Sequence, residues 1–388
     1  MSDNTQHATQ RRIIVVCNGL DPGHIRHDRM PTLNQWAGEG VSGEVQAVMP
    51  SVGTLNNASI CCGAFPAQHG FTGEPTFPAA NEDGARGAEG VGMPTLFERA
   101  GAYGVRSALL TSKRTMLRRL GSGAEIRLAA DSPEPEWRER LGTPPAEDSP
   151  AMAAWLLRAA QTVLRERPDI GCIYVHTGEA TMQAATKKPS GPEELLRTVD
   201  DHLADLARVA PDAARLITSD HRLSAKHRCW DLVQVAISQR LPIRQAVTAG
   251  DDAAQKGDST YAGAAWISVD SDSEREAVRH GLLALSGVAD VLTREAAVQA
   301  FALPEEGAGD LMVLGDRETV FGHLDAPCKA LRTPTFGAGS QHERHVPLVI
   351  HNALDAPAAG FFRYNIDLAR WLYRQTALMS RPRLQVAG

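Results

Sequence analysis

One stretch of the chain, residues 50–70 (PSVGTLNNASICCGAFPAQHG), combines several residue types that active sites use. A turn that contains Thr54 leads to the paired amides of Asn56 and Asn57, and an apolar helical segment follows. A threonine hydroxyl in such a place can act as a nucleophile when a base or a metal ion activates it. It can equally cap the helix by accepting a backbone N–H. The residues alone leave both roles open for Thr54, and ligand contact or turn formation open for the asparagines.

Polar side chains also follow four short apolar segments. The segments are 11–25, 95–113, 169–179 and 214–222, and the polar residues at their ends are Asn18 and Asp21, Lys113, His176 and Glu179, and Asp220 and His221. Short apolar runs that stop at turn residues predict buried strands. Imidazole, carboxylate and ammonium groups could together carry out acid–base chemistry, grip an anion or hold a metal ion. Each could also be an ordinary structural or solvated residue, so its role depends on whether the fold brings the groups together.

Helical segments separate these strands. Residues 31–40, 151–167, 192–209 and 365–379 have the pattern of helices, and residues 41–50 and 346–352 have the pattern of further strands. This alternation predicts an α/β fold, a doubly wound and mostly parallel sheet with helices on both faces. In such sheets ligands bind beyond the carboxyl ends of the strands. The fold therefore predicts that the polar groups converge at one edge of the sheet.

Residues 226–330 depart from this pattern. They contain a loop-like stretch at 244–260, followed by short strand and helix segments between residues 263 and 316. We interpret the interval as a small α/β cap inserted into the core, which would comprise residues 1–225 and 331–388. A cap in this place would cover the site.

The composition limits the class of protein. The chain has 388 residues, of which 43% are hydrophobic, enough for a large core with a secondary lobe. Its formal net charge is -6 and it has no extended basic run, so we expect no nucleic-acid partner. Six cysteines without CxxC spacing, a polar N-terminus and the lack of a membrane-length apolar run predict a cytoplasmic protein without membrane contact. The sequence leaves open whether the chain forms a homo-oligomer.

Four segments resemble the alkaline phosphatase superfamily, and specifically its branch of phosphonoacetate hydrolase and the nucleotide pyrophosphatase/phosphodiesterases. They are 13–25, 50–74, 218–227 and 346–352, in this order. The most specific parts are NNxSI followed by GxxPxxHG in the second segment, and SDH followed by AKH in the third. The resemblance covers nearly the whole chain, cap included. It implies hydrolysis with two divalent metals, usually zinc, that activate a Thr or Ser nucleophile and clamp phosphoryl oxygens.

Several positions of that implied site carry other residues in this chain. The resemblance implies an aspartate where Asn18 stands, the nucleophile where Gly53 stands, and a histidine where Gln183 stands. Glu179 takes the place of an implied aspartate. An amide oxygen is neutral and a poorer zinc ligand than a carboxylate. Because the implied nucleophile position is a glycine, we predict that the neighbouring Thr54 is not a covalent nucleophile in the usual sense of the family.

Asp220 and His221 match the implied metal ligands in full. The last implied ligand, a histidine before the final strand, has no counterpart in the aligned place, although His342 and His345 lie nearby. We therefore expect at most one divalent ion, zinc or manganese, held through Asp220 and His221 with Glu179 as the next ligand. A site without metal is the alternative.

A small anionic molecule is the expected substrate. Residues 110–123 resemble a phosphonoacetate hydrolase segment in which two lysines hold the anionic end of the substrate; Lys113 fits the first, and Thr115 replaces the second. The resemblance implies further substrate contacts from Asn18, Asn56, Asn57 and His342.

Three functions stay open on this basis. The first is a hydrolase with an altered metal site. The second is a lyase, decarboxylase or non-phosphoryl hydrolase that uses His, Glu and Lys as acid–base and anion-binding groups, with one metal or none. The third is an inactive binding protein on the same scaffold. We expect a divergent enzyme, labelled a hydrolase after its family, with candidate catalytic residues Thr54, His176, Glu179 and His221.

Overall fold

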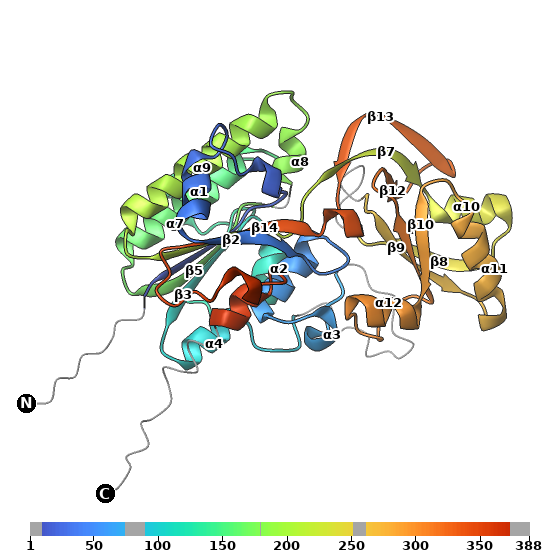
Figure 1. Cartoon of the computed structure of the whole chain (residues 1–388), viewed down its shortest axis with the longest axis horizontal. Helices are drawn as coiled ribbons and strands as arrows, with labels where there is room; N and C mark the ends of the chain where they lie inside the picture. The colour runs from blue at the N-terminus through green and yellow to red at the C-terminus, as the bar shows by residue number, and fades with distance from the viewer. Residues whose placement is uncertain (1–9, 74–89, 179, 251–260, 373–388) are drawn as a thin grey trace, which may run out of the picture.

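The computed structural model describes residues 10–73, 90–178, 180–250 and 261–372. Figure 1 shows two lobes, a larger one that carries the N-terminal strands and a smaller one formed by the yellow and orange part of the chain. Within the described ranges, no helix is both long enough and apolar enough to cross a bilayer.

The larger lobe is built on a seven-stranded sheet in the order β2-β14-β6-β1-β5-β3-β4. The bounds are β1 (Arg12–Val16), β2 (Val41–Gln46), β3 (Arg106–Thr111), β4 (Ile126–Ala129), β5 (Ile170–His176), β6 (Ala214–Thr218) and β14 (His345–His351). The strands from β6 to β4 are parallel to one another, and β14 is antiparallel to both β6 and β2. The expected mostly parallel sheet is thus confirmed.

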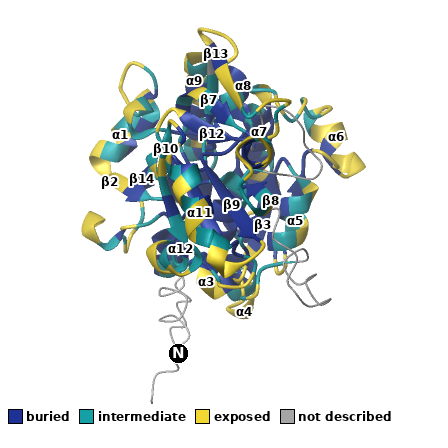
Figure 2. Ribbon diagram, turned by 90° about the vertical axis from the view of Figure 1, so that its right-hand side faces the viewer, coloured by how far each residue is buried: buried dark blue, intermediate teal, exposed yellow. Residues whose placement is uncertain are grey.

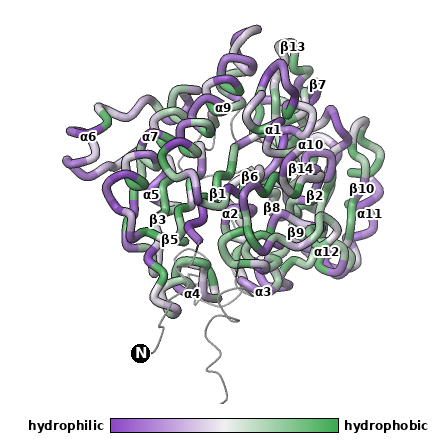
Figure 3. The backbone as a smooth tube through the Cα atoms, turned by 60° about the vertical axis from the view of Figure 1, so that its left-hand side comes forward, coloured by the Kyte–Doolittle hydropathy of each residue, from purple (hydrophilic) through white to green (hydrophobic). Residues whose placement is uncertain are grey.

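Helices cover both faces of this sheet (Figure 1). One face carries α1 (Pro31–Glu39), α7 (Ala151–Glu166) and α9 (Gly191–Val209), and the other carries α2 (Gly53–Cys62), α4 (Leu96–Ala102), α5 (Arg114–Leu120) and the helical residues 367–372. Strand β1 shows why the central strands are apolar throughout, because Ile13 and Val15 pack on the first layer and Ile14 and Val16 on the second. The burial and hydropathy colours in Figures 2 and 3 follow this layering, with apolar strands inside and polar residues on the outer helices.

Shorter elements complete the lobe. They are α3 (Pro66–His69), α6 (Pro135–Leu141), α8 (Thr181–Ala185) and the 3₁₀ helices η1 (Pro22–His24), η4 (Gln341–Glu343) and η5 (Ala359–Phe361). The strand expected at 41–50 ends at Gln46, and the part of the expected helix 365–379 beyond residue 372 lies outside the described residues.

The smaller lobe contains two sheets. One has the order β12-β7-β13, with β7 (Ser224–Trp230), β12 (Thr319–Phe321) and β13 (Cys328–Gly337); the other has the order β10-β11-β9-β8, with β8 (Ile243–Thr248), β9 (Ala264–Val269), β10 (Val288–Thr293) and β11 (Leu311–Gly315). Helices α10 (Leu232–Gln239), α11 (Asp272–Leu283) and α12 (Arg294–Phe301) pack against them. The strands span 224–337, slightly more than the expected cap, because β7 and β13 pair as they leave and re-enter the core.

One detail of the cap differs from the expectation. Residues 244–248 belong to strand β8, so the prediction of a loop over 244–260 is wrong there, and residues 251–260 lie outside the described part. Strand β8 is at the edge of its sheet and pairs only with β9 among the described strands. Its Arg244 and Gln245 are exposed, which hides the apolar alternation that marks a strand.

Candidate active site

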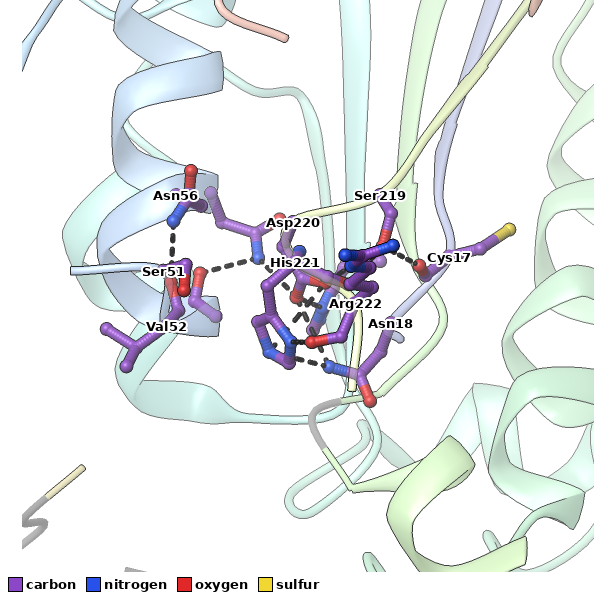
Figure 4. Close-up of polar contacts among 12 residues, drawn as sticks. Cys17, Asn18, Ser51, Val52, Asn56, Ser219, Asp220, His221 and Arg222 are labelled. Atoms are coloured by element: carbon purple, nitrogen blue, oxygen red, sulfur yellow. Dashed lines mark hydrogen bonds and ion pairs between the residues drawn. The ribbon is translucent and has the colours of Figure 1, made fainter. Parts of the chain in front are cut away.

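The carboxyl ends of strands β5, β1 and β6 lie next to one another in the sheet. Asn18 follows β1, His176 ends β5, and Asp220 and His221 follow β6. Figure 4 shows Asn18, Asp220 and His221 pointing toward one another beside the first turn of helix α2. The fold thus brings together polar residues from segments that are about two hundred positions apart, as the parallel sheet requires.

Asp220 forms the centre of this group and is fully buried. Its Oδ2 accepts hydrogen bonds from His176 Nε2 at 3.0 Å, Asn18 Nδ2 at 3.3 Å and Asn57 Nδ2 at 3.4 Å. Its Oδ1 accepts the backbone N–H of His221 at 2.9 Å. Burial alone would raise the pKa of this carboxyl, but the adjacent His221 imidazole and the hydrogen bonds from His176 and Asn18 hold the pKa below its usual value. The centre of the site is therefore a carboxylate that nitrogen donors surround.

The contacts of His221 define which of its ring nitrogens carries the proton. Nδ1 lies 3.0 Å from the carbonyl oxygen of Arg222, which can only accept, so Nδ1 is the donor. Nε2 lies 3.4 Å from Asn18 Nδ2, which can only donate, so Nε2 presents a lone pair. An imidazole whose Nε2 is turned into a cluster of polar groups is suited to accept a proton from a bound molecule.

Helix α2 begins at Gly53, beside the carboxylate. A Cβ at Gly53 would lie 3.1 Å from Asp220 Oδ2 and 3.8 Å from His221 Nε2. A side chain at this position would therefore press against the carboxylate, whereas glycine places no side chain in front of Asp220 and His221. The space also faces the first turn of α2, whose free N–H groups and dipole favour negative charge.

Two predicted roles in the α2 region require correction. The N-cap of α2 is Val52, without a side-chain cap, so Thr54 is the second helical residue and the capping interpretation of Thr54 is wrong. Helix α2 already begins at Gly53, one residue before Thr54. The amide of Asn56 turns toward the backbone, where Oδ1 accepts from Val48 N–H at 2.8 Å and Nδ2 donates to Val48 O at 3.2 Å. Asn56 thus fixes the turn before α2 in place of the expected substrate contact.

Asn57 instead faces the site, and Tyr174 fixes its orientation. Tyr174 donates its hydroxyl to Asn57 Oδ1 at 2.7 Å, so Nδ2 must face Gly53 O, at 2.8 Å, and Asp220. Burial raises the pKa of the Tyr174 hydroxyl well above its usual value, so the hydroxyl stays protonated and remains a donor. Sequence reasoning missed Tyr174. The available signal was its place two residues before His176, on the same face of β5.

Two further predicted residues, Lys113 and Glu179, are not part of the group around Asp220 in the described structure. Lys113 ends the β3 segment as the N-cap of α5, and its Nζ lies 3.1 Å from Glu147 Oε1. This ion pair places the ammonium at the same edge of the sheet as Asp220 but away from it, since strands β5 and β1 lie between β3, which precedes Lys113, and β6, which precedes Asp220. Glu179 lies outside the described residues.

The remaining predicted positions contact the cap or the surface. Gln183 donates Nε2 to Phe336 O of β13 at 2.8 Å, which ties α8 to the cap. His342 contributes backbone groups, because its N–H donates to Ser340 Oγ and its carbonyl accepts from Arg222 Nε. His345 Nδ1 lies 2.7 Å from Glu44 at the surface.

The side chains that the structure describes do not fit the two-metal centre that the family resemblance implies. In the part of the chain that the structure describes, no group of three or more His, Cys, Asp or Glu residues is arranged to hold a metal ion. Asn18 and Gln183 turn their amide nitrogens toward oxygen acceptors, and an amide nitrogen donates a hydrogen bond where a metal would need a lone pair.

Comparison with known proteins places this geometry in a family. The model of the type I phosphodiesterase / nucleotide pyrophosphatase family matches residues 12–330. The chain belongs to this family. It is therefore a member of the alkaline phosphatase superfamily, a group of hydrolase-like enzymes, as the resemblance of its segments implies.

Solved structures of low sequence identity share the fold. Phosphonoacetate hydrolase from Sinorhizobium meliloti, in complex with phosphonoformate, is 23% identical with a TM-score of 0.81, and the match covers 95% of this chain and 96% of that one. Murine ectonucleotide pyrophosphatase / phosphodiesterase 5 is 14% identical with a TM-score of 0.66 and 96% coverage of both chains. The alkaline phosphatase PafA is 11% identical with a TM-score of 0.61, over 89% of this chain and 91% of that one.

Proposed function

We propose that this chain is a divergent hydrolase of its family that acts on a small anionic substrate, with His221 as the general base and without a two-metal centre. The observation that carries the proposal is the place of His221 Nε2, which has a long contact of 3.4 Å with Asn18 Nδ2 and lies beside Gly53, a position without a side chain. A base in this position could take a proton from water while the water oxygen bonds to the electrophilic atom of the substrate. The bond from that atom to the leaving group then breaks, and the leaving group receives the proton back from the His221 imidazolium. Asp220 would stabilise the imidazolium that forms, because its Oδ1 lies 3.9 Å from Nε2.

The first turn of α2 is the proposed seat of the anionic group. Its first residue, Gly53, lies beside Asp220 and His221, the first N–H groups of a helix favour negative charge, and Asn57 adds an amide that Tyr174 holds in place. Thr54, half-buried in this turn, could add a hydroxyl contact. These are uncharged contacts, so an ammonium group would complete the recognition of an anion.

A proton-abstraction reaction, as in a lyase or decarboxylase, is the second candidate. The observation in its favour is Gly53 itself, since this position offers no oxygen for a covalent intermediate. His221 would then take the proton from carbon or oxygen of the substrate directly, and the electron pair released would expel a leaving group or, in a decarboxylation, follow the breaking of the bond to the carboxylate, with the same anion seat.

Lys113 is the proposed ammonium partner, and its replacement tests the substrate class. Lys113→Met should raise KM for the anion about 10- to 150-fold, since a hydrogen bond to a charged group contributes about 1.5–3 kcal/mol. The measurement is product release from phosphonoacetate and from a nitrophenyl phosphodiester, in EDTA. Glu147→Gln is the matched control, because it breaks the Lys113–Glu147 ion pair but keeps the ammonium. An unchanged KM in Lys113→Met would remove Lys113 from the site, and tight binding of anions without any turnover would favour an inactive binding protein.

A further inference from the structure

We infer that hydrogen-bond donors take the place of a metal ion at Asp220, and that Asn18 decides between the two arrangements. The nitrogen Nδ2 of Asn18 lies 3.3 Å from Asp220 Oδ2 and 3.4 Å from His221 Nε2. One amide group therefore contacts both side chains that match metal ligands, from the side on which a shared cation would have to lie. The inference concerns the folded site and holds whichever reaction the site catalyses.

Two further donors help to take the place of a metal ion at Asp220. Asp220 Oδ2 also accepts from His176 Nε2 at 3.0 Å and from Asn57 Nδ2 at 3.4 Å, so three nitrogens surround one carboxylate oxygen. Asn57 is held from outside, because Tyr174 donates its hydroxyl to Asn57 Oδ1. The backbone of Asn18 is fixed where its N–H donates to Thr177 Oγ1 at 3.0 Å. An ionised carboxylate buried this deeply needs either a cation or several donors. The three donors meet that need without an ion.

A carboxylate at position 18 would remove one donor from Asp220 and favour a bound cation instead. The substitution Asn18→Asp keeps the size of the side chain but places a second carboxylate about 3.3 Å from Asp220 Oδ2, the separation now held by the amide. Two carboxylates that close repel each other unless they share a proton or a cation. Together with His221 Nε2 they form three ligands of the types that zinc prefers, and Gly53 places no side chain among them.

Zinc titration of the tag-free Asn18→Asp variant tests the inference. We expect the wild-type melting temperature to be the same in EDTA and in excess zinc. We expect the variant to melt lower than wild type in EDTA, to gain roughly 5 °C or more in zinc, and to retain one zinc per chain after dialysis. The control Asn18→Asp/His221→Ala lacks the third ligand and should lose most of the zinc response.

The zinc response of the variant and of the wild type decides whether the inference holds. A variant that folds only with zinc supports the inference as strongly as a shift in melting temperature. A variant that binds zinc no better than wild type, or that stays unfolded in zinc, overturns it. A wild-type protein that shows the same zinc response as the variant also overturns it, whereas a lack of turnover with every substrate would count only against the proposed reaction.

Discussion

Lys226→Met should lower the free energy of unfolding by about 3–5 kcal/mol, because it leaves a buried carboxylate without its cation. Lys226 and Glu343 are both fully buried, and Lys226 Nζ lies 2.9 Å from Glu343 Oε1. The ammonium also donates to Arg317 O at 3.0 Å. Burial by itself would raise the pKa of Glu343, but the charge of Lys226 and its hydrogen bonds hold the pKa below its usual value. Glu343 is therefore a buried carboxylate that depends on the contact with Lys226.

The position of this ion pair connects the cap to the candidate site. Lys226 belongs to β7 of the cap, whereas Glu343 ends η4 of the core. Glu343 Oε2 accepts from Ser340 Oγ at 2.6 Å, and Ser340 O accepts from Ser51 Oγ at 2.6 Å in the turn that precedes α2. Loss of the pair should thus loosen both the seat of the cap and the turn that presents Gly53.

A double-mutant cycle with Glu343→Leu provides the control. When both charges are replaced by apolar side chains of similar volume, no unpaired charge is left in the interior. Urea denaturation should therefore show that Lys226→Met/Glu343→Leu is less destabilised than the sum of the two single variants by about 2 kcal/mol or more. Additive losses would mean that the two side chains act independently and that the ion pair does not connect the lobes.

His221→Gln should lower kcat by about 10²- to 10⁴-fold, the usual contribution of a general base. The amide of glutamine can keep a hydrogen bond to Asn18 or to Arg222 O, but it cannot accept a proton from a substrate or from water. Turnover of the anion that the wild type accepts best is the measurement, followed across pH. The rise of kcat/KM with pH that a free base produces should disappear in the variant.

A matched histidine elsewhere controls for the substitution itself. His345 lies at the surface, where its Nδ1 pairs with Glu44, so His345→Gln should leave kcat unchanged. Equal activity of His221→Gln and wild type would transfer the role of base to another group. A loss in kcat that comes with a large fall in melting temperature, by contrast, would indicate a structural role for His221.

The sequence could predict the sheet and the convergence at its edge because both follow from local patterns. The β-branched runs that end at Asn18, His176 and Asp220 define parallel strands, and parallel strands align their carboxyl ends. The resemblance to the family likewise indicates, from the offset to the paired asparagines, that Gly53 stands where the nucleophile would be. Gly53 lies next to Asp220, where a side chain would have contacted the carboxylate.

Side-chain directions within the site could not be predicted, since they depend on tertiary partners. Asn56 and Asn57 are adjacent in sequence, yet one amide binds the backbone of its own turn and the other contacts Asp220. Their difference depends on Tyr174, which lies more than a hundred residues later and reads as an ordinary core residue of β5. The ion pair of Lys113 with Glu147 is equally non-local, and no periodic pattern marks it.

The metal content of the wild-type protein tests the central claim most directly, namely that Asp220 is held by nitrogen donors in place of a metal ion. Tag-free protein purified without added metal, saturated with zinc or manganese and then dialysed, would be measured by elemental analysis. The arrangement of Asn18, Asn57 and His176 around Asp220 predicts far less than one divalent ion per chain. One or two tightly held ions per chain after dialysis would contradict the account.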